Sequence, residues 1–232
     1  MIVYLSKKKA FIFVAILIFL FLSMGTFFVV STVSAKPVNS ICVVIDPGHG
    51  GIDGGCVGKT TGVCESDLNL IYAKNLAEQL KGMGISSCLT RKDKNGLYDK
   101  NASNLKKSDM LKRKEIIESV NPTLVISIHM NSFSSSSACG AQVFYKKDNE
   151  SGKIFANCVQ IQLNKCIKNA KKTAKIGDYY MVNCTSLPAV LVECGYLSNK
   201  NEEILLQKKD YQNKFCYVLC CGIIDFLNEN KP

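Results

Sequence analysis

The chain contains only two histidines, and both stand where a parallel α/β sheet would place reactive groups. His49 follows the apolar run ICVVID by three residues, His129 ends the run LVISIH, and Glu193 ends the run AVLVE. Ligands of open α/β sheets gather beyond the carboxyl ends of the strands. A single histidine is more often a core or surface residue, but three ionisable groups at three strand ends indicate a site.

The residue types at these positions suit metal-assisted hydrolysis. Two imidazoles and one carboxylate with an open fourth position form a catalytic zinc site. Such a metal lowers the pKa of its water to about 7 and polarises a carbonyl. A further carboxylate must then carry a proton to the leaving nitrogen, and Glu193 has that chemistry. Glu65 stands just before Ser66, which is a good N-cap for the helix that follows. Spacing alone therefore favours the interpretation of Glu65 as a solvated carboxylate near the positive end of the helix dipole.

The elements that must position these residues alternate between strands and helices. A Gly-rich loop, 47–65, follows the first strand, and Gly82 and Gly84 end the helix after it. The predicted strands are 41–46, 85–90, 124–129, 140–145, 179–183 and 189–193, and the later helices are 109–120, 151–169, 201–208 and 211–228. This alternation predicts a largely parallel α/β sheet covered on both faces.

The N-terminus predicts export. Lys7, Lys8 and Lys9 precede an apolar run of about 24 residues, long enough to span a membrane, and Val-Ser-Ala stands just before Lys36. Residues 1–35 are therefore either a cleaved signal peptide or an N-terminal anchor. A linker, 36–40, leads to a single predicted catalytic domain, 41–228, which would lie outside the cytoplasm.

Charge and cysteine content narrow the class of partner. The formal net charge is +10, which suits an anionic polymer such as cell wall. The lysines are scattered, not striped along one helix, and this argues against nucleic acid. Twelve cysteines would suggest disulfides in an exported protein, but most lie in apolar elements and none forms a C-x-x-C pair. They are predicted to be free core thiols.

Four motifs resemble a known family. They are VVIDPGHGGIDGG (43–55), ESDLNL (65–70), SIHMNS (127–132) and PAVLVECGYLSN (188–199). In this order they resemble the catalytic domain of the amidase-3 type of zinc-dependent N-acetylmuramoyl-L-alanine amidases, over nearly all of residues 41–228.

The resemblance implies specific roles and a specific fold. It implies that His49, Glu65 and His129 bind zinc and that Glu193 is the catalytic base. It also implies a mixed, mostly parallel six-stranded sheet flanked by helices. The substrate would be the lactyl amide between N-acetylmuramic acid and L-alanine in peptidoglycan.

Size and layout are most similar to the sporulation-type amidases, which remove the stem peptide so that a deacetylase can complete muramic-δ-lactam in the spore cortex. The enzyme would then act at the outer face of the membrane, in the cell wall or in the spore intermembrane space. Targeting would depend on the N-terminal membrane segment or on a protein partner. Two alternatives remain open: a zinc peptidase of the stem peptide, and a catalytically silent wall-binding scaffold.

Some residues depart from the family pattern or have no settled role. Met130 and the segment 134–137 are bulkier or more flexible than the usual loop and put contacts at the rim of the site in doubt. Arg91 and Arg113 stand where the family often carries arginines. They are either structural residues, contacts to a substrate carboxylate or plain surface charges.

Overall fold

The computed structural model describes residues 41–229. The predicted leader or anchor, 1–35, and the linker, 36–40, lie outside the described residues. Within the described part, every helix is too short or too polar to cross a membrane.

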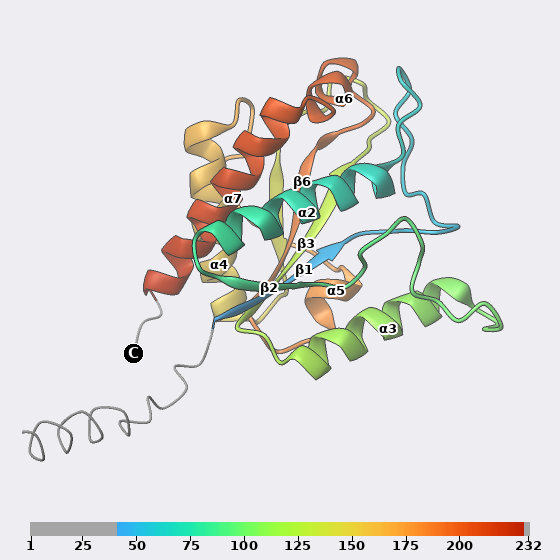
Figure 1. Ribbon diagram of the computed structural model, residues 1–232. Helices are drawn as coiled ribbons and strands as arrows, with labels where there is room; N and C mark the ends of the chain where they lie inside the picture. Colours follow the sequence, from blue (N-terminus) through green and yellow to red (C-terminus); the bar gives the residue numbers. More distant parts are fainter. Residues whose placement is uncertain (1–40, 230–232) are drawn as a thin grey trace, which may run out of the picture. The chain divides into compact units, whose positions relative to one another are not determined.

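A six-stranded sheet forms the centre of the domain, with the strand order β2-β1-β3-β6-β4-β5 (Figure 1). The strands are β1 (Cys42–Pro47), β2 (Ser86–Leu89), β3 (Leu124–Asn131), β4 (Gln142–Tyr145), β5 (Lys175–Ile176) and β6 (Ala189–Tyr196). The pairs along β2-β1-β3-β6 are parallel, β4 is antiparallel to β6, and β5 is parallel to β4. The predicted mixed, mostly parallel six-stranded sheet is confirmed.

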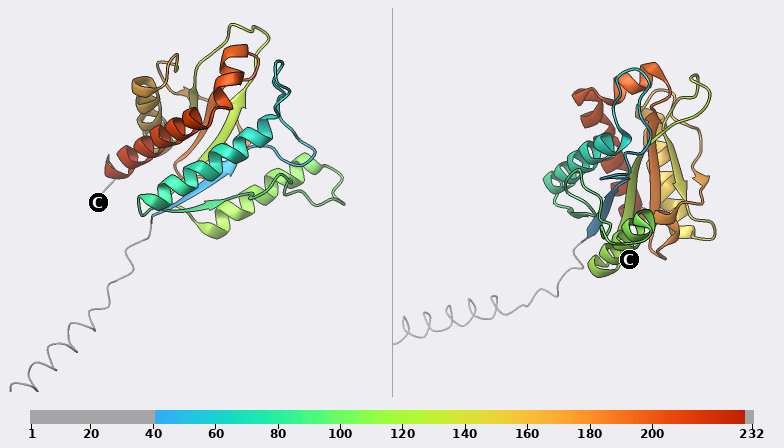
Figure 2. Two further views of the ribbon diagram at one scale, coloured as in Figure 1. Left: turned by 45° about the horizontal axis from the view of Figure 1, so that its top comes forward. Right: turned by 90° about the vertical axis from the view of Figure 1, so that its right-hand side faces the viewer.

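Helices cover both faces of this sheet (Figure 2). They are α2 (Glu65–Gly82), α3 (Leu105–Val120), α4 (Glu150–Cys166), α5 (Tyr180–Asn183), α6 (Lys200–Leu206) and α7 (Lys209–Glu229). Val43 and Ile45 pack in the core shared with α2, α4 and α7, whereas Val44 packs in the core shared with α3 and α5. A strand buried on both faces reads as a continuous apolar run, which explains why β1 was visible in the sequence.

The start of α2 differs from the prediction. The helix begins at Glu65, and its N-cap is Cys64, whose side chain makes no capping hydrogen bond. Ser66 is therefore not the cap. Its backbone N–H donates to the carbonyl of Gly54 at 3.0 Å, so contacts with the preceding loop, and not a local side chain, satisfy the helix start. This places Glu65 inside the first turn, where it is held by the helix.

The start of α3 was also predicted too late. The helix begins at Leu105, and not at Asp109, because Asn104 caps it by accepting a hydrogen bond from the backbone N–H of Lys107 at 2.9 Å. Asparagine is among the preferred N-cap residues. The added turn carries lysines and was mistaken for the end of an irregular loop.

The predicted strand 179–183 was wrong. This segment contains the short helix α5, whose Met181 and Val182 are buried in the core beneath α3. Two adjacent buried residues fit a helical turn, whereas a half-buried strand would alternate. The edge strand β5 lies a few residues earlier, at Lys175–Ile176.

All twelve cysteines are free thiols, as predicted. Those that are buried are Cys158, Cys194, Cys216 and Cys220. Cys166, at the end of α4, is exposed. The prediction of core thiols is therefore confirmed for the buried four and not for the chain as a whole.

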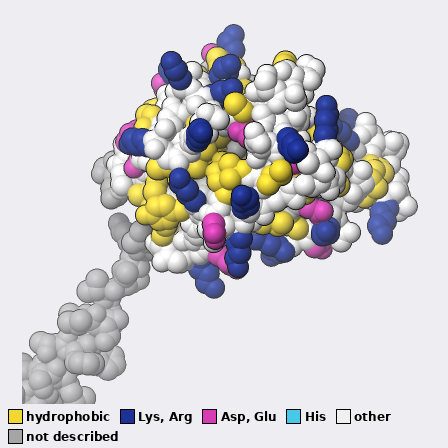
Figure 3. Space-filling model, turned by 90° about the horizontal axis from the view of Figure 1, so that it is seen from above, with side chains coloured by type: hydrophobic (Ala, Val, Ile, Leu, Met, Phe, Trp, Pro, Cys, Tyr) yellow, Lys and Arg dark blue, Asp and Glu magenta, His cyan; other side chains and the backbone are white. Residues whose placement is uncertain are grey.

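The positive charge is dispersed over the surface. On the face seen in Figure 3, lysine and arginine side chains stand apart among hydrophobic and uncharged ones. Some pair with acids along a helix, as Lys112 does with Glu115 at 2.6 Å. A dispersed charge of this kind attracts anionic polymers over a broad surface.

Candidate metal centre

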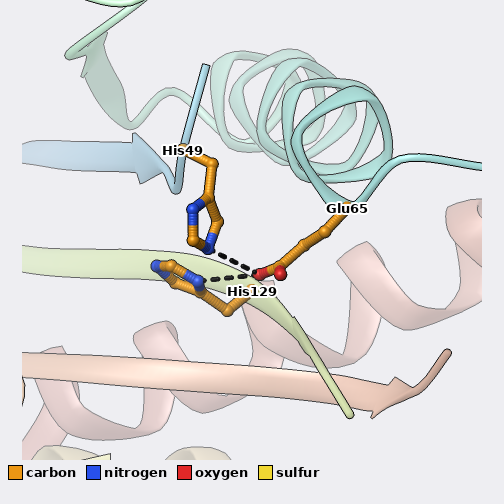
Figure 4. A group of neighbouring side chains, drawn as sticks. All are labelled: His49, Glu65 and His129. Carbon is orange, nitrogen blue, oxygen red and sulfur yellow. Dashed lines mark hydrogen bonds and ion pairs between the residues drawn. The ribbon is translucent and has the colours of Figure 1, made fainter. Parts of the chain in front are cut away.

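Three of the predicted side chains meet beyond the carboxyl ends of β1 and β3 (Figure 4). Glu65 Oε1 lies 3.2 Å from Nε2 of His49 and 2.9 Å from Nδ1 of His129. One ligand atom from each residue lies within 4.8 Å of the others. The two imidazole rings meet edge to face, with centroids 5.0 Å apart. Two nitrogens and one carboxylate oxygen therefore face one another, which is a donor set that zinc takes in catalytic sites.

Glu65 is the centre of this cluster, although spacing alone indicated no role for it. Its Oε1 accepts a hydrogen bond from the backbone N–H of Met130 at 3.1 Å, and its Oε2 accepts one from Cys56 at 2.9 Å. Met130 itself has its side chain in the core and does not disturb the rim. Burial alone would raise the pKa of Glu65, but its hydrogen bonds with His129 and His49 hold that pKa far below its usual range. The carboxylate is therefore ionised and ready to bind a cation.

His49 is oriented by a tight turn that follows it. The residue has a left-handed backbone with φ 61°, and Gly50 and Asp53 then form an isolated antiparallel bridge. The turn brings Asp53 Oδ2 to 2.9 Å from His49 Nδ1, while Gly55 N–H donates to the other oxygen of Asp53. A carboxylate on one ring nitrogen keeps the proton there. The other ring nitrogen, Nε2, faces Glu65 Oε1 at 3.2 Å.

The electrostatics of His49 agree with this arrangement. Burial alone would lower the pKa of His49, but the hydrogen bonds and charges of Glu65 and Asp53 raise it to about 8. Two carboxylates therefore face one imidazole from opposite sides. A cation placed between the ring and Glu65 would replace the proton that the ring otherwise holds.

Two glycines of the predicted loop give the ligands room. A Cβ atom on Gly48 would lie 2.1 Å from Cε1 of His129, and a Cβ atom on Gly55 would lie 2.5 Å from Oε2 of Glu65. Any larger residue at either position would displace a side chain of the cluster. The serine-rich segment 134–137, beyond His129, is exposed.

Glu193 lies beside the cluster but outside it. It pairs with His129 in the register of β3 and β6 and is only 7% exposed. Its Oε2 has no hydrogen-bond partner among the described residues. Burial raises the pKa of Glu193 to about 7, with the nearby Glu65 adding to the rise and His129 opposing it. A carboxyl group with this pKa exchanges its proton near neutrality, as a general base and acid must.

Arg91 and Arg113 are buried, so the surface-charge interpretation is wrong. Arg91 donates through Nε to the carbonyl of Pro47 at 3.0 Å, and through Nη2 to the carbonyls of Gly48 at 2.9 Å and Ser66 at 2.8 Å. Its guanidinium therefore ties the loop after β1 to the first turn of α2. These contacts support a structural role.

Arg113 fixes the end of β1 from the other side. It pairs with Asp46 at 2.7 Å, with both side chains fully buried, and donates to the carbonyl of His49 at 2.6 Å. Asp46 also accepts hydrogen bonds from Thr90 at 2.6 Å and Ser127 at 2.7 Å. The pair of Asp46 and Arg113 thus joins β1, β3 and the residue after β2 to the backbone of a candidate ligand.

Three further residues of this site had no role predicted from the sequence. Asp53 stands four residues after His49, and Asn69, whose amide donates to Glu65 Oε1 at 3.3 Å, stands four residues after Glu65. The second spacing brings side chains together on a helix, so it could have been used. Asp46 gives no such signal, because its arginine partner is 67 residues away in the sequence.

The pair at the end of β1 generates a pH prediction. Replacing Asp46→Asn leaves the buried Arg113 without its charge partner, and the free energy of unfolding at neutral pH should fall by about 3–5 kcal/mol. Burial alone would raise the pKa of Asp46, but Arg113, Thr90 and Ser127 lower it below its usual value. The stabilisation is therefore complete above the unfolded-state pKa of about 3.9 and is lost as the pH falls through the folded-state pKa.

Urea unfolding of the wild type and of Asp46→Asn between about pH 7 and about pH 3 checks this prediction. The difference between their free energies of unfolding should become smaller as the pH falls. The matched control is Asp148→Asn, at an exposed residue with φ 61°, a backbone that asparagine also adopts. This control should leave stability unchanged. If wild type and Asp46→Asn differ in free energy of unfolding by the same amount at every pH, the stabilising charge pair of Asp46 and Arg113 is contradicted.

The turn after β1 generates a second prediction, on metal affinity. Asp53→Ala removes the carboxylate that orients His49 and should weaken zinc binding by about 10- to 100-fold. Competition with a chromogenic chelator measures the affinity. Asp67→Ala is the control, because Asp67 pairs with the exposed Lys94 and is not one of the three clustered residues. Equal zinc affinities for wild type and Asp53→Ala would refute the orienting role.

Comparisons with known proteins agree with the site. Residues 43–225 match the Amidase_3 family, described as N-acetylmuramoyl-L-alanine amidase. The germination-specific N-acetylmuramoyl-L-alanine amidase of Bacillus subtilis (strain 168) is 34% identical over 198 residues, covering 83% of this chain and 82% of that protein.

Two solved structures extend the comparison. The CwlD amidase of Clostridioides difficile, in complex with the GerS lipoprotein, has 34% identity and a TM-score of 0.79, covering 82% of this chain and 100% of that one. The catalytic domain of CwlV, an amidase of Bacillus (Paenibacillus) polymyxa var. colistinus, has 31% identity and a TM-score of 0.72, covering 81% of this chain and 98% of that one. This chain belongs to the Amidase_3 family and is an N-acetylmuramoyl-L-alanine amidase, a hydrolase of peptidoglycan.

Proposed function

We propose that His49, Glu65 and His129 hold a zinc ion and that Glu193 moves the proton in hydrolysis of the lactyl amide between N-acetylmuramic acid and L-alanine. The observation that carries this proposal is the convergence of His49 Nε2, His129 Nδ1 and Glu65 Oε1 at the carboxyl ends of the strands. The zinc, when bound, supplies an acidified water and polarises the amide carbonyl.

The protein groups around the cluster fit a cation with one carboxylate ligand. Glu65 is ionised, and its second oxygen is held by the N–H of Cys56. Asp53 holds a proton on Nδ1 of His49, so that Nε2 is the nitrogen that would give up its proton to a metal ion. The ring of His129 packs over Gly48, which fixes its plane. Each donor is thus oriented by a contact of its own, as second-shell groups do in metal sites.

The position of Glu193 supports a role in proton transfer and not in metal binding. It stands beside His129 across the β3–β6 pair, and its pKa of about 7 lets it accept a proton from the attacking water. The same group then returns the proton to the alanine nitrogen as the amide bond breaks. Its unpartnered Oε2 is the atom available for this exchange.

We further propose that the enzyme acts in maturation of the spore cortex. Its relatives include a germination-specific amidase of Bacillus subtilis and the CwlD amidase of Clostridioides difficile. In this role the amidase removes stem peptides from muramic acid, and a deacetylase then completes muramic-δ-lactam.

The place of action is outside the cytoplasm, since the family acts on the cell wall. We propose that residues 1–35 bring the domain there as a signal peptide or a membrane anchor. The CwlD relative was solved in complex with a lipoprotein, and we propose a protein partner of this kind for the present chain.

The role of Glu193 has a direct test. Glu193→Gln keeps the shape of the side chain but removes the base, and kcat on muropeptide should fall by about 10²–10⁴-fold. Zinc content, measured by inductively coupled plasma mass spectrometry, should stay near one ion per chain. The control is Glu78→Gln, at an exposed position of α2, which should leave kcat unchanged.

The products distinguish the amidase from its rivals. Digestion of purified peptidoglycan should release stem peptides whose new amine terminus is L-alanine. A new terminus inside the stem peptide would instead identify a zinc peptidase. Absence of cleavage and of metal in the wild-type protein would identify a silent scaffold.

A further inference from the structure

Cys166 is the exposed cysteine among the twelve of the chain. It is the last residue of α4, and α4 packs against α7 in the core on one face of the sheet (Figure 1). Helix α7 carries Cys216, Cys220 and Cys221. The first two are buried, whereas Cys221 is half-buried. Neither Cys166 nor Cys221 belongs to the candidate metal centre.

Two contacts in the core show that α4 and α7 run in opposite directions. The rings of Phe155 and Phe226 lie with their centroids 5.0 Å apart. One turn farther along α4 and one turn back along α7, a Cβ atom on Gly222 would lie 2.6 Å from the Cα of Val159. The helices are therefore antiparallel, and their backbones approach closely at Gly222. A disulfide joins residues whose Cα atoms are about 4.4–6.8 Å apart, so a close approach of this kind is what a bridge between two helices requires.

A second contact fixes which residues face each other among the half-buried side chains of this helix pair. Gln162 donates to Oδ2 of Asp225 at 2.5 Å, and both residues are half-buried. Residues four apart lie on the same side of a helix. One turn farther along α4 is Cys166, and one turn back along α7 is Cys221. Because the helices are antiparallel, these two cysteines form the next facing pair.

The electrostatics of Cys221 agree with this register. Burial raises the pKa of its thiol, and a hydrogen bond with Tyr217 opposes the rise. The charges of Asp225 and of Cys166 add to the rise of that pKa. The Cys166 thiol is thus near enough for its charge to act on Cys221.

The two thiols differ in access to solvent, which sets the order in which they can react. Thiol–disulfide exchange begins when a thiolate attacks a disulfide that it can reach. Cys166 is exposed and can attack an oxidant in solution, whereas Cys221 is half-buried and faces Cys166. Disulfides form and persist outside the cytoplasm, where a hydrolase of the cell wall acts.

We propose that Cys166 and Cys221 are the site of an inter-helix disulfide, which forms outside the cytoplasm by exchange with a low-molecular-weight disulfide. The Cys166 thiolate attacks the oxidant and forms a mixed disulfide, with release of one small thiol. The Cys221 thiolate then attacks Cys166 Sγ and releases the second small thiol. The two protons of the protein thiols end on the two released thiols, so one disulfide is reduced as the other is formed.

The bridge ties α7 to α4 and closes a long loop. This loop holds β5, α5, β6 and α6, and β6 carries Glu193. A disulfide stabilises a protein mainly by restricting the unfolded chain, so the oxidised form resists unfolding of the strand that carries the candidate base. The bridge needs neither zinc nor substrate, and its formation is therefore independent of the proposed amidase mechanism.

The test treats the full chain with oxidised glutathione, blocks the remaining thiols with iodoacetamide and maps the peptides by mass spectrometry without reduction. Wild type, Cys166→Ser and Cys88→Ser are compared. Cys88 is the matched control, since it is a half-buried cysteine of β2 that packs against the core on the other face of the sheet. Thermal unfolding of the oxidised and the reduced form of each protein, after removal of the reagents, gives the second readout.

Wild type and Cys88→Ser should each give a peptide pair joined through Cys166 and Cys221, and Cys166→Ser should give none. Oxidation should raise the Tm of wild type and of Cys88→Ser by about 5–15 °C and leave that of Cys166→Ser unchanged. Recovery of Cys166 as an alkylated thiol, as a stable glutathione adduct or in a bridge with another cysteine would overturn the proposal. The same shift of Tm in Cys166→Ser, or an unchanged Tm in bridged wild type, would overturn the stabilising effect.

Discussion

The buried ion pair between Asp46 and Arg113 fixes the direction in which the chain leaves β1. Neither side chain is exposed to solvent, and a charge buried without its partner would be strongly destabilising. Asp46 therefore cannot move away from Arg113 without loss of stability. Because Arg113 also donates to the carbonyl of His49, the constraint on the core becomes a constraint on the backbone of a candidate metal ligand. The geometry of the candidate metal centre thus depends on a buried pair that is not part of it.

The other loops of the site are held in a similar way, by carboxylates that accept backbone N–H groups. Glu203 of α6 accepts from the backbone of Thr60 at 2.9 Å and Thr61 at 2.6 Å, which closes the Gly-rich loop ahead of Glu65. The adjacent Glu202 accepts from Gly140 at 2.7 Å, next to β4. A short helix therefore anchors segments on two sides of the site. Such supports keep ligands in their working geometry before any metal or substrate arrives.

Much of the fold and part of the candidate site could be predicted from the sequence, because the strands follow a regular pattern. Parallel strands buried on both faces read as unbroken apolar runs, and their carboxyl ends share one edge. Three short segments therefore predicted His49, His129 and Glu193 at one edge of the sheet, and in the structure His129 lies opposite Glu193. Glu65 could not be placed in this way, because its approach depends on how a long loop closes. Only the family resemblance assigned it a role.

What the sequence could not indicate were contacts between distant residues. The partners of Arg91 and Arg113 are mostly backbone carbonyls of the loop after β1, and no residue pattern marks a carbonyl as a partner. The start of α2 was misread for a similar reason, since the N–H of Ser66 is satisfied by a loop carbonyl. Segment 179–183 was predicted as a strand, but its two adjacent buried residues, Met181 and Val182, belong to a helical turn.

The central claim is that this site holds zinc through two imidazoles and one carboxylate, in a protein that also has twelve free thiols. Cys56 is the thiol-bearing residue whose backbone already touches Glu65. X-ray absorption at the zinc edge of the loaded protein distinguishes the two kinds of ligand directly. The account predicts only nitrogen and oxygen neighbours at about 2.0–2.2 Å. A sulfur neighbour at about 2.3 Å would contradict it.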